Sequence, residues 1–199
     1  MNKGTNTRQS ILEHAVAQSS LMGLEGLTIG RLADELKLSK SGLYAHFKSK
    51  EALQISVLEA AADRFTQIVI RPALKEARGE PRVRALFERW LDWSRSQVVP
   101  GGCIFVTASV EYDDQPGPVR DYLVHAQQDW VDLIATTARF AVEVGHFRAN
   151  LSGKRFAQEL YGILLAHYHF TRLLADPDAT SHTRAAFEHL IARSRVVQP

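Results

Sequence analysis

The chain has 199 residues, of which 45% are hydrophobic and 23% charged, a composition that suits one or two globular domains with a substantial core. Its single cysteine excludes an internal disulfide framework and a cysteine-rich metal cluster. The polar start MNKGTNTRQS lacks the apolar segment of a secretory signal, and polar residues interrupt every apolar run before it reaches the length of a membrane span. We therefore expect a cytoplasmic protein with no metal, cofactor or membrane association.

The formal net charge of +2 conceals an uneven distribution. The first fifty residues hold seven lysines and arginines against four acidic residues, whereas the remaining residues hold seventeen against eighteen. All of the excess positive charge therefore lies at the N-terminal end. This permits a polyanionic partner without requiring one.

Helical periodicity governs the first part of the chain. Apolar residues at i, i+4 spacing predict a first helix that ends near Gly23. Thr28 is placed as the N-cap of a second helix, and Ser39 opens a third, very short one. Ser49 opens a fourth helix that continues towards Pro72.

Five more helices are expected in the rest of the chain. Helical spacing and the breaks between segments place them from about Val83 to Leu91, Ile104 to Tyr112, Val119 to Gly145, Ser152 to Leu173, and around Phe187 to Ile191. The second of these contains enough β-branched residues to suit a strand as well. No alternating strand pattern or internal repeat occurs, so the predicted fold class is all-α with about nine helices.

The three short N-terminal helices, with a tight turn between the last two, are typical of a helix-turn-helix. In that motif the second helix of the pair enters the major groove with its N-terminal residues against base edges. Leu43 and Phe47, spaced i, i+4, would hold this helix down from one side. Ser39, Lys40 and Ser41 would then point outward at its N-terminal end.

Neighbouring residues supply groups that suit a phosphate backbone. Tyr44, His46 and Lys50 offer a phenol, an imidazole and an ammonium group, and Thr28 leaves free backbone N–H groups at a helix N-terminus. Gly42 costs about 1 kcal/mol relative to alanine in a helix, and closer approach of the backbone to a duplex would compensate. By pattern alone, a pair of solvated surface helices fits about as well as DNA binding.

The segment LTIGRLADELKLSKSGLYAHFKSKEAL resembles the DNA-binding segment of the TetR/AcrR family of bacterial transcriptional regulators. The resemblance rests on Thr-x-x-x-Leu-Ala, Leu-Tyr-x-His-Phe and Lys-x-Lys-x-x-Leu at the family's spacing, and it covers about the first quarter of the chain. It implies a three-helix helix-turn-helix domain at residues 1–50 and a helical ligand-binding and dimerisation domain at 51–199. The function that it implies is a homodimeric repressor that binds a palindromic DNA operator and is released by a small-molecule effector.

The resemblance also assigns roles to individual residues. The phosphate contacts that it implies are Thr28, Tyr44, His46 and Lys50. The base-facing residues that it implies are Ser39, Lys40 and Ser41. Gly30 departs from the family, whose members often carry a longer polar side chain there, and this leaves Lys40 as the main candidate for reading guanine.

The larger part of the chain offers residue types rather than a motif. Candidate residues for a dimer interface in the last two helices are Leu160, Leu164, Leu174, Phe187, Leu190 and Ile191. Candidate residues for an aromatic ligand pocket are Trp90, Trp93, Phe105, Trp130, Tyr161, His167 and Tyr168. For each of them, ordinary core packing is the competing interpretation.

Other functions stay open at this point. Cys103 follows two glycines at a predicted helix start, where the helix dipole favours a thiolate, so a redox or electrophile sensor is one alternative and a small buried residue the other. Glu111, Asp113 and Asp114 are clustered carboxylates, but no nucleophile, base or metal motif accompanies them to indicate an enzyme. A helical small-molecule-binding module without sequence-specific DNA binding is a further alternative.

Overall fold

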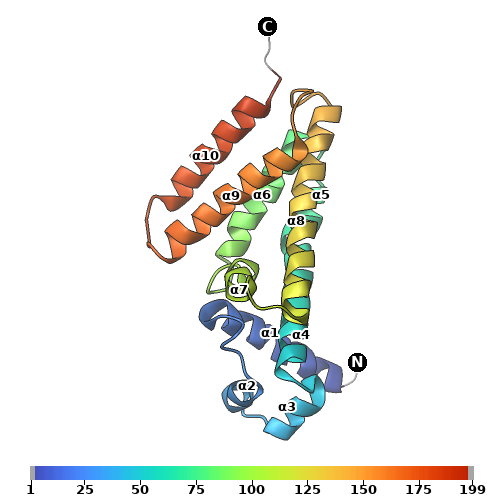
Figure 1. Ribbon diagram of the computed structural model, residues 1–199, viewed down its shortest axis with the longest axis vertical. Coiled ribbons are helices and arrows are strands. Elements are labelled where there is room, and N and C mark those ends of the chain that lie inside the picture. The colour runs from blue at the N-terminus through green and yellow to red at the C-terminus, as the bar shows by residue number, and fades with distance from the viewer. Residues whose placement is uncertain (1–2, 197–199) are drawn as a thin grey trace. The chain divides into compact units, whose positions relative to one another are not determined.

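The computed structural model describes the backbone of residues 3–196 and the side chains of residues 7–196 (Figure 1). The helical elements are α1 (Lys3–Met22), α2 (Ile29–Leu36), α3 (Lys40–Phe47), α4 (Lys50–Phe65), the π-helical η1 (Thr66–Ile70), α5 (Arg71–Leu74), α6 (Glu80–Ser94), α7 (Ile104–Tyr112), α8 (Pro118–Glu143), α9 (Gly153–Arg172) and α10 (Ala179–Ser194). Because α4, η1 and α5 follow one another without a break, residues 3–196 form nine helical segments. The prediction of an all-α fold with about nine helices is confirmed.

The polar residues that were predicted to open helices do so through their side chains. The hydroxyl oxygens of Thr28, Ser39, Ser49 and Ser152 each accept a hydrogen bond from the backbone N–H three residues later, at 3.0 to 3.3 Å. Each hydroxyl thereby satisfies one of the N–H groups that the first turn of a helix leaves without a partner. The segment after Cys103 is helical, so the alternative of a strand there is wrong.

The described chain divides into two compact units. The first comprises residues up to 65 together with 93–126, and the second comprises 66–92 with the residues from 127 onward. This division differs from the boundary expected at residue 50, because compactness groups α4 and α7 with the three N-terminal helices. No helix within residues 3–196 combines the length and the apolar content needed to cross a bilayer.

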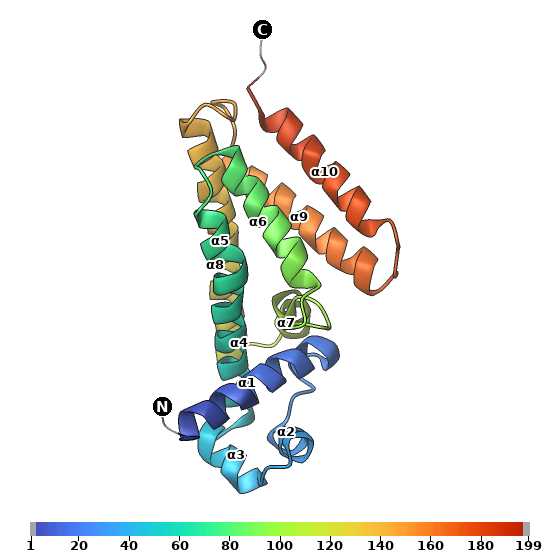
Figure 2. The ribbon, with the colours of Figure 1, turned by 180° about the vertical axis from the view of Figure 1, so that it is seen from behind.

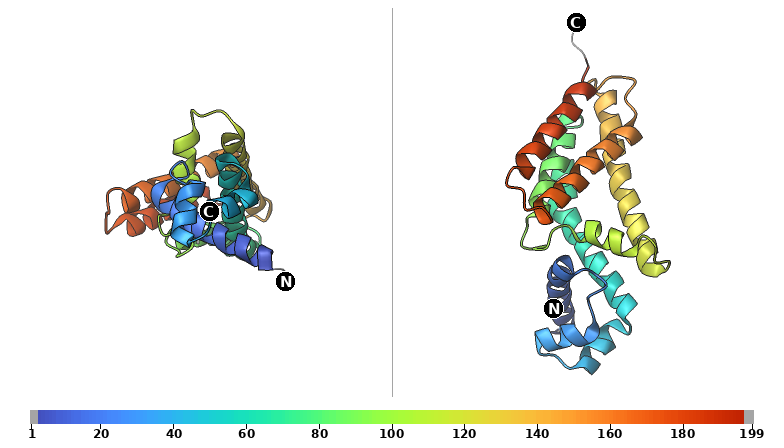
Figure 3. Two further views of the ribbon diagram at one scale, coloured as in Figure 1. Left: turned by 90° about the horizontal axis from the view of Figure 1, so that it is seen from below. Right: turned by 60° about the vertical axis from the view of Figure 1, so that its left-hand side comes forward.

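In the first unit, α1 packs against α4, and α2 and α3 pack against each other (Figure 3). Leu43 and Phe47 are 1% and 3% exposed, as predicted for the residues that hold α3 down. Leu32 and Ala33 of α2 and Leu53 of α4 are also buried in this unit. The core of the N-terminal helices is therefore built from the apolar faces that the spacing indicated.

The loop between α6 and α7 lies very close to the C-terminal end of α1. The backbone N–H of Gly101 donates a hydrogen bond to Ser20 Oγ at 2.9 Å. A Cβ on Gly101 would lie 1.8 Å from the backbone oxygen of Ser20, well inside contact distance. Glycine is therefore required at this position, because two backbone segments meet there.

In the second unit, aromatic rings join α6 to the last two helices. Phe87 of α6 stacks on Phe187 of α10 with 3.8 Å between ring centroids, and Trp90 meets His167 of α9 edge-on at 6.0 Å. Helices α9 and α10 run antiparallel to each other (Figure 2). At one end of this unit Glu80 accepts hydrogen bonds from two arginine side chains, and this lowers its pKa to about 2.

We predict that Gly101→Ala lowers the free energy of unfolding by about 1–3 kcal/mol or more, because the added methyl group forces two backbone segments apart. Urea unfolding of the purified protein measures the change. Gly30→Ala is the matched control, since a Cβ at this helical position would have only ordinary contacts with Lys40, the nearest at 3.7 Å. We expect the control to be unchanged or stabilised by up to about 1 kcal/mol. Equal destabilisation by both substitutions would contradict the close approach at Gly101.

Candidate nucleic-acid interface

Helices α2 and α3 are joined by a three-residue turn. Lys37 ends α2 in the left-handed conformation, with φ 55° and ψ 38°, and its N–H bonds back to the carbonyl oxygens of Ala33 and Asp34. Leu38 follows, its N–H bonded to Ala33 at 2.9 Å, and Ser39 then caps α3. The prediction of a tight turn between two short helices is confirmed.

The N-terminal end of α3 is exposed, as a groove-reading helix requires. Ser39, Lys40 and Ser41 all lie at the surface. The Ser39 hydroxyl caps the helix at Gly42 and also accepts a hydrogen bond from the Ser41 hydroxyl at 3.4 Å. Because the Ser39 hydroxyl caps the helix and the Ser41 hydroxyl donates to it, Lys40 carries more of the available polar surface at this end.

Gly30 and Lys40 share one location on this surface. A Cβ on Gly30 would lie 3.7 Å from Lys40 Cε and 3.8 Å from Lys40 Nζ. The absence of a side chain at position 30 therefore leaves room for the ammonium group of Lys40 beside the start of α2. This placement is compatible with the predicted role of Lys40 as the main base-reading side chain.

The other residues expected to face phosphate are also accessible. Thr28, Gly42 and His46 are exposed, and the Tyr44 side chain is 58% exposed although it is large and aromatic. A Cβ on Gly42 would lie 2.9 Å from the Ser39 hydroxyl oxygen, so glycine here also protects the helix cap. The exposed lysines on the same helices and turns are Lys37, Lys40 and Lys48.

Lys50 differs from the other candidate contacts because it already has an anionic partner. Its Nζ donates a hydrogen bond to Glu25 Oε1 at 2.5 Å, and both side chains are partly exposed. The other carboxylate oxygen of Glu25 accepts a hydrogen bond from the Tyr112 hydroxyl at 2.7 Å. Hydrogen bonds from Lys50 and then Tyr112 hold the pKa of Glu25 below its usual value, whereas burial and the bond to Glu25 raise the pKa of Tyr112.

The loop between α1 and α2 is fixed from two further directions. Glu111 Oε2 accepts hydrogen bonds from the backbone N–H groups of Leu24 at 2.8 Å and Glu25 at 3.0 Å. Gln54 Nε2 donates to the Leu24 carbonyl oxygen at 3.0 Å and to the Tyr112 hydroxyl at 2.8 Å. Sequence reasoning missed the roles of Glu25, Gln54 and Tyr112.

The carboxylates that had suggested an enzyme are not gathered into a site. Glu111 is used to cap the loop N–H groups, and Asp113 and Asp114 are exposed after the end of α7. Within residues 7–196, no group of three or more acidic, histidine or cysteine side chains could hold a metal ion.

Comparisons with known proteins identify the chain's family. The family model described as "Bacterial regulatory proteins, tetR family" matches residues 11–57, which contain the helix-turn-helix. A second model, described as "Tetracyclin repressor-like, C-terminal domain", matches residues 79–187, more than half of the chain. The chain belongs to the TetR family.

Three TetR-family relatives illustrate the range of similarity. A curated relative, the HTH-type transcriptional repressor AcnR of Corynebacterium glutamicum, is 35% identical over 75 residues, which are 38% of this chain and 40% of that protein. A TetR transcriptional regulator of Chloroflexus aurantiacus superposes with a TM-score of 0.85 at 23% identity over 99% of this chain and 100% of its own. The structure of AibR in complex with isovaleryl coenzyme A and operator DNA superposes with a TM-score of 0.69 at 22% identity over 94% of this chain and 96% of its own. The chain matches less than half the length of the curated relative, and the structural likenesses show the fold alone.

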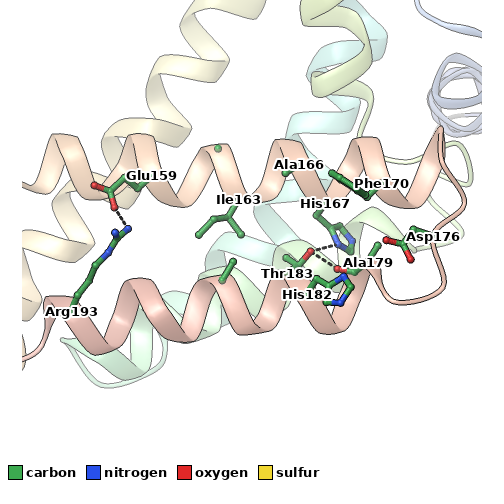
Figure 4. A pocket seen from close by; sticks show the side chains of 12 residues that line it. Glu159, Ile163, Ala166, His167, Phe170, Asp176, Ala179, His182, Thr183 and Arg193 are labelled. Atoms are coloured by element: carbon green, nitrogen blue, oxygen red, sulfur yellow. Dashed lines mark hydrogen bonds and ion pairs between the residues drawn. The ribbon is translucent and has the colours of Figure 1, made fainter.

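The TetR-type C-terminal part of the chain carries a groove between α9 and α10 (Figure 4). The groove has a volume of about 490 Å³. Small and apolar residues, which include Ile163, Ala166, Phe170 and Ala186, share its lining with six polar or charged residues: Glu159, His167, Asp176, His182, Thr183 and Arg193. Two of the lining residues, His167 and Thr183, are joined by a hydrogen bond of 3.0 Å. The Thr183 hydroxyl donates its proton to the Ala179 carbonyl oxygen at 2.6 Å, so it accepts from His167 Nδ1. Large apolar side chains continue along the exposed surface of α9 and the residues after it: Leu165, Phe170, Leu173 and Leu174.

Most of the residues predicted for the dimer interface do not lie on this surface. Five of the six are buried within the subunit itself: Leu160, Leu164, Phe187, Leu190 and Ile191. Burial leaves them little surface to offer a partner, and their role in dimerisation stays a prediction. Leu174 is exposed and remains available.

The residues predicted for a ligand pocket are distributed over both units. In the first unit, Phe65 packs edge-on against Trp93 at 5.5 Å and against Phe105 at 6.3 Å. In the second unit, Trp90 contacts His167. The Tyr161 hydroxyl donates to Gln127 at 2.8 Å, Trp130 is buried and Tyr168 is half-buried. Their role in ligand binding stays a prediction.

Cys103 does not have the environment of a reactive thiol. It precedes the first turn of α7, as expected, but it is only 2% exposed. Burial is the largest influence on this thiol and raises its pKa, which is the opposite of the shift that a sensor needs. Burial therefore favours the other interpretation, a small buried residue, and sensing through Cys103 stays an untested prediction.

We predict different effects for two lysine substitutions at the TetR-type helix-turn-helix. Lys40→Ala should relax sequence preference at one base pair in each half-site, because a bidentate contact to a base contributes about 1–3 kcal/mol of discrimination. Lys50→Ala should weaken binding to all duplexes similarly and reduce the salt dependence by about one unit per subunit. Fluorescence-anisotropy titrations with an operator and its single-base variants, over a range of salt concentrations, measure both. Unchanged binding by both variants would show that these roles are wrong.

Proposed function

We propose that this protein is a ligand-responsive transcriptional regulator that binds operator DNA as a homodimer, with one helix-turn-helix in each half-site. The single observation that carries the proposal is the exposed N-terminal end of α3, where Lys40 and Ser41 face outward while Leu43 and Phe47 are buried on the opposite side. Such an end fits the major groove, in which hydrogen bonds to base edges distinguish all four base pairs. Thr28, Tyr44, His46 and Lys50 would contact the flanking phosphates.

The sign of regulation that we propose is repression relieved by a small molecule. AcnR is named a repressor, and the AibR structure holds both isovaleryl coenzyme A and operator DNA. The AibR complex is an example of this fold binding both a small molecule and DNA, and for this chain we propose that an effector bound to residues 51–199 opposes DNA binding by residues 1–50. Thermodynamic linkage requires this opposition to be equal in both directions. The proposal is of a cytoplasmic regulator without catalytic activity.

For the dimer interface we propose the open face of α9 and α10 rather than their buried sides. The groove that contains Ala166, Phe170 and Ala186 would receive the matching helices of the second subunit, and Leu173 and Leu174 would extend the contact. Two helices from each subunit would then form a four-helix bundle. An interface of this kind must be isologous, because the same surface is used by both subunits.

The function is tested by selecting bound sequences from a pool of random DNA duplexes. We expect a palindromic sequence whose half-sites are separated by about one helical turn or a multiple of it, because two recognition helices enter successive major grooves on one side of the DNA. Recovery of no preferred sequence, with small-molecule binding retained, would favour the alternative of a ligand-binding module without sequence-specific DNA binding.

The interface is tested with two adjacent alanines on α10. Both are exposed in the subunit, but Ala186 lines the groove, and Ala185 does not belong to its lining. We expect Ala186→Arg to give a monomer in sedimentation experiments, since it adds a long charged side chain to a surface that the second subunit would have to cover. Binding to the selected palindrome should then weaken roughly a hundredfold, because the two helix-turn-helix motifs are no longer linked in one dimer. The control, Ala185→Arg, should remain a dimer, and monomers from both variants or from neither would contradict the proposed face.

A further inference from the structure

The partner of Lys50 is not an ordinary surface carboxylate. Exposed ion pairs usually join two flexible side chains, and the pair can separate at little cost. Here Glu25 is fixed at both ends: its backbone N–H is bonded to Glu111, and its side chain is bonded to Tyr112. The carboxylate is therefore held in place beside the ammonium group of Lys50, at 2.5 Å.

The hydrogen bonds around Tyr112 orient its hydroxyl towards Glu25. Gln54 Nε2 donates to the hydroxyl oxygen at 2.8 Å and to the carbonyl oxygen of Leu24 at 3.0 Å, which directs the amide. Because the hydroxyl oxygen already accepts from Gln54, its single proton is left for the carboxylate of Glu25. Tyr112 is itself buried at the end of α7, so this arrangement cannot swing away with a surface loop. A chain of polarised hydrogen bonds thus runs from α4 through α7 to the ion pair.

An operator phosphate that approaches Lys50 must meet this fixed negative charge. The ammonium group has to be shared with the phosphate or released by the carboxylate, and the two anions repel each other at short distance. If the carboxylate were mobile it would move aside, but its bonds to Tyr112 and Glu111 oppose that movement.

We propose that Glu25 is a built-in competitor of the operator phosphate for Lys50, and that Tyr112 is the positioning residue that holds Glu25 in place. The proposal rests on the proposed function, because it takes Lys50 as a phosphate contact. It makes the last turn of α7 a determinant of DNA affinity, although no residue of α7 belongs to the helix-turn-helix. Any change that displaced Tyr112 from Glu25 would alter the charge that Lys50 offers to DNA.

The test uses the full-length protein and two duplexes of about 30 base pairs, roughly three helical turns: the sequence recovered by selection and a random sequence. Glu25→Gln keeps the size of the side chain and its ability to accept from Tyr112 while removing the charge. We expect it to tighten binding by about 1.5- to fivefold for each Lys50, the range for an exposed ion pair, and by the square of that for a dimer. The factor should be the same on both duplexes, because phosphate contacts carry no sequence information.

The matched control is Glu51→Gln, which removes an exposed carboxylate from the residue next to Lys50. It reports the general effect of one negative charge fewer near DNA, and we expect it to tighten binding less than Glu25→Gln. In a Lys50→Met background the advantage of Glu25→Gln over Glu51→Gln should disappear. Tyr112→Phe should tighten binding in the parent but have no effect once Glu25→Gln is present.

Each outcome decides between clear alternatives. Weaker binding by Glu25→Gln would mean that the carboxylate supports Lys50 rather than competing with DNA, and the proposal would be overturned. Equal gains from Glu25→Gln and Glu51→Gln, or a gain that persists without Lys50, would overturn it as well. If the parent binds both duplexes equally, the proposed sequence-specific function fails, while the variants still test the competition for Lys50. If the parent binds neither duplex at low salt, both proposals fail together.

Discussion

The candidate interface depends on one constraint, the burial of Leu43 and Phe47 on the inner side of α3. An eight-residue helix is too short to be stable alone in water, because the cost of nucleation is not recovered within two turns. The buried pair fixes the helix against its neighbours, and the Ser39 cap begins it at a defined residue. Only then do Lys40 and Ser41 have a fixed direction in which to point.

The second requirement is that the α1–α2 loop be held, because Thr28 and the start of α2 follow directly from it. The residues that hold it come from far along the chain: Gly101 lies against the end of α1, and Glu111 caps the loop N–H groups. This explains why the first compact unit includes α7 as well as the N-terminal helices. A helix-turn-helix of about fifty residues is thus completed by a helix that the sequence places some sixty residues later.

The features that could be predicted from the sequence were those with local signals. The serine and threonine caps, the i, i+4 pair in α3 and the all-α class each depend on residues within one or two helical turns. The ion pair of Glu25 with Lys50 and its link to Tyr112 join positions up to 87 residues apart, and no local pattern reports such a contact. The burial of α9 was not predicted for a related reason: this helix has apolar residues on most sides, so spacing alone could not decide which of them the rest of the subunit would cover. For Cys103, position at a helix start was predicted correctly, but its burial depends on the whole unit and outweighs the dipole.

The lysines of the first unit whose side chains the structure describes therefore divide into two kinds, with different consequences for the proposed DNA binding. Within residues 7–196, no ion pair involves Lys37, Lys40 or Lys48, so each can approach DNA without giving up a partner. Lys50 can approach a phosphate only in competition with Glu25. On our proposal, its contribution to DNA affinity is therefore smaller and depends on the position of the Glu25 carboxylate. Lys40 at the tip of α3 suits sequence reading, since its interaction with a base edge is not offset by an internal carboxylate. Lys50 suits adjustment of affinity, because its net attraction for phosphate can be changed through Tyr112 while the reading surface of α3 stays as it is.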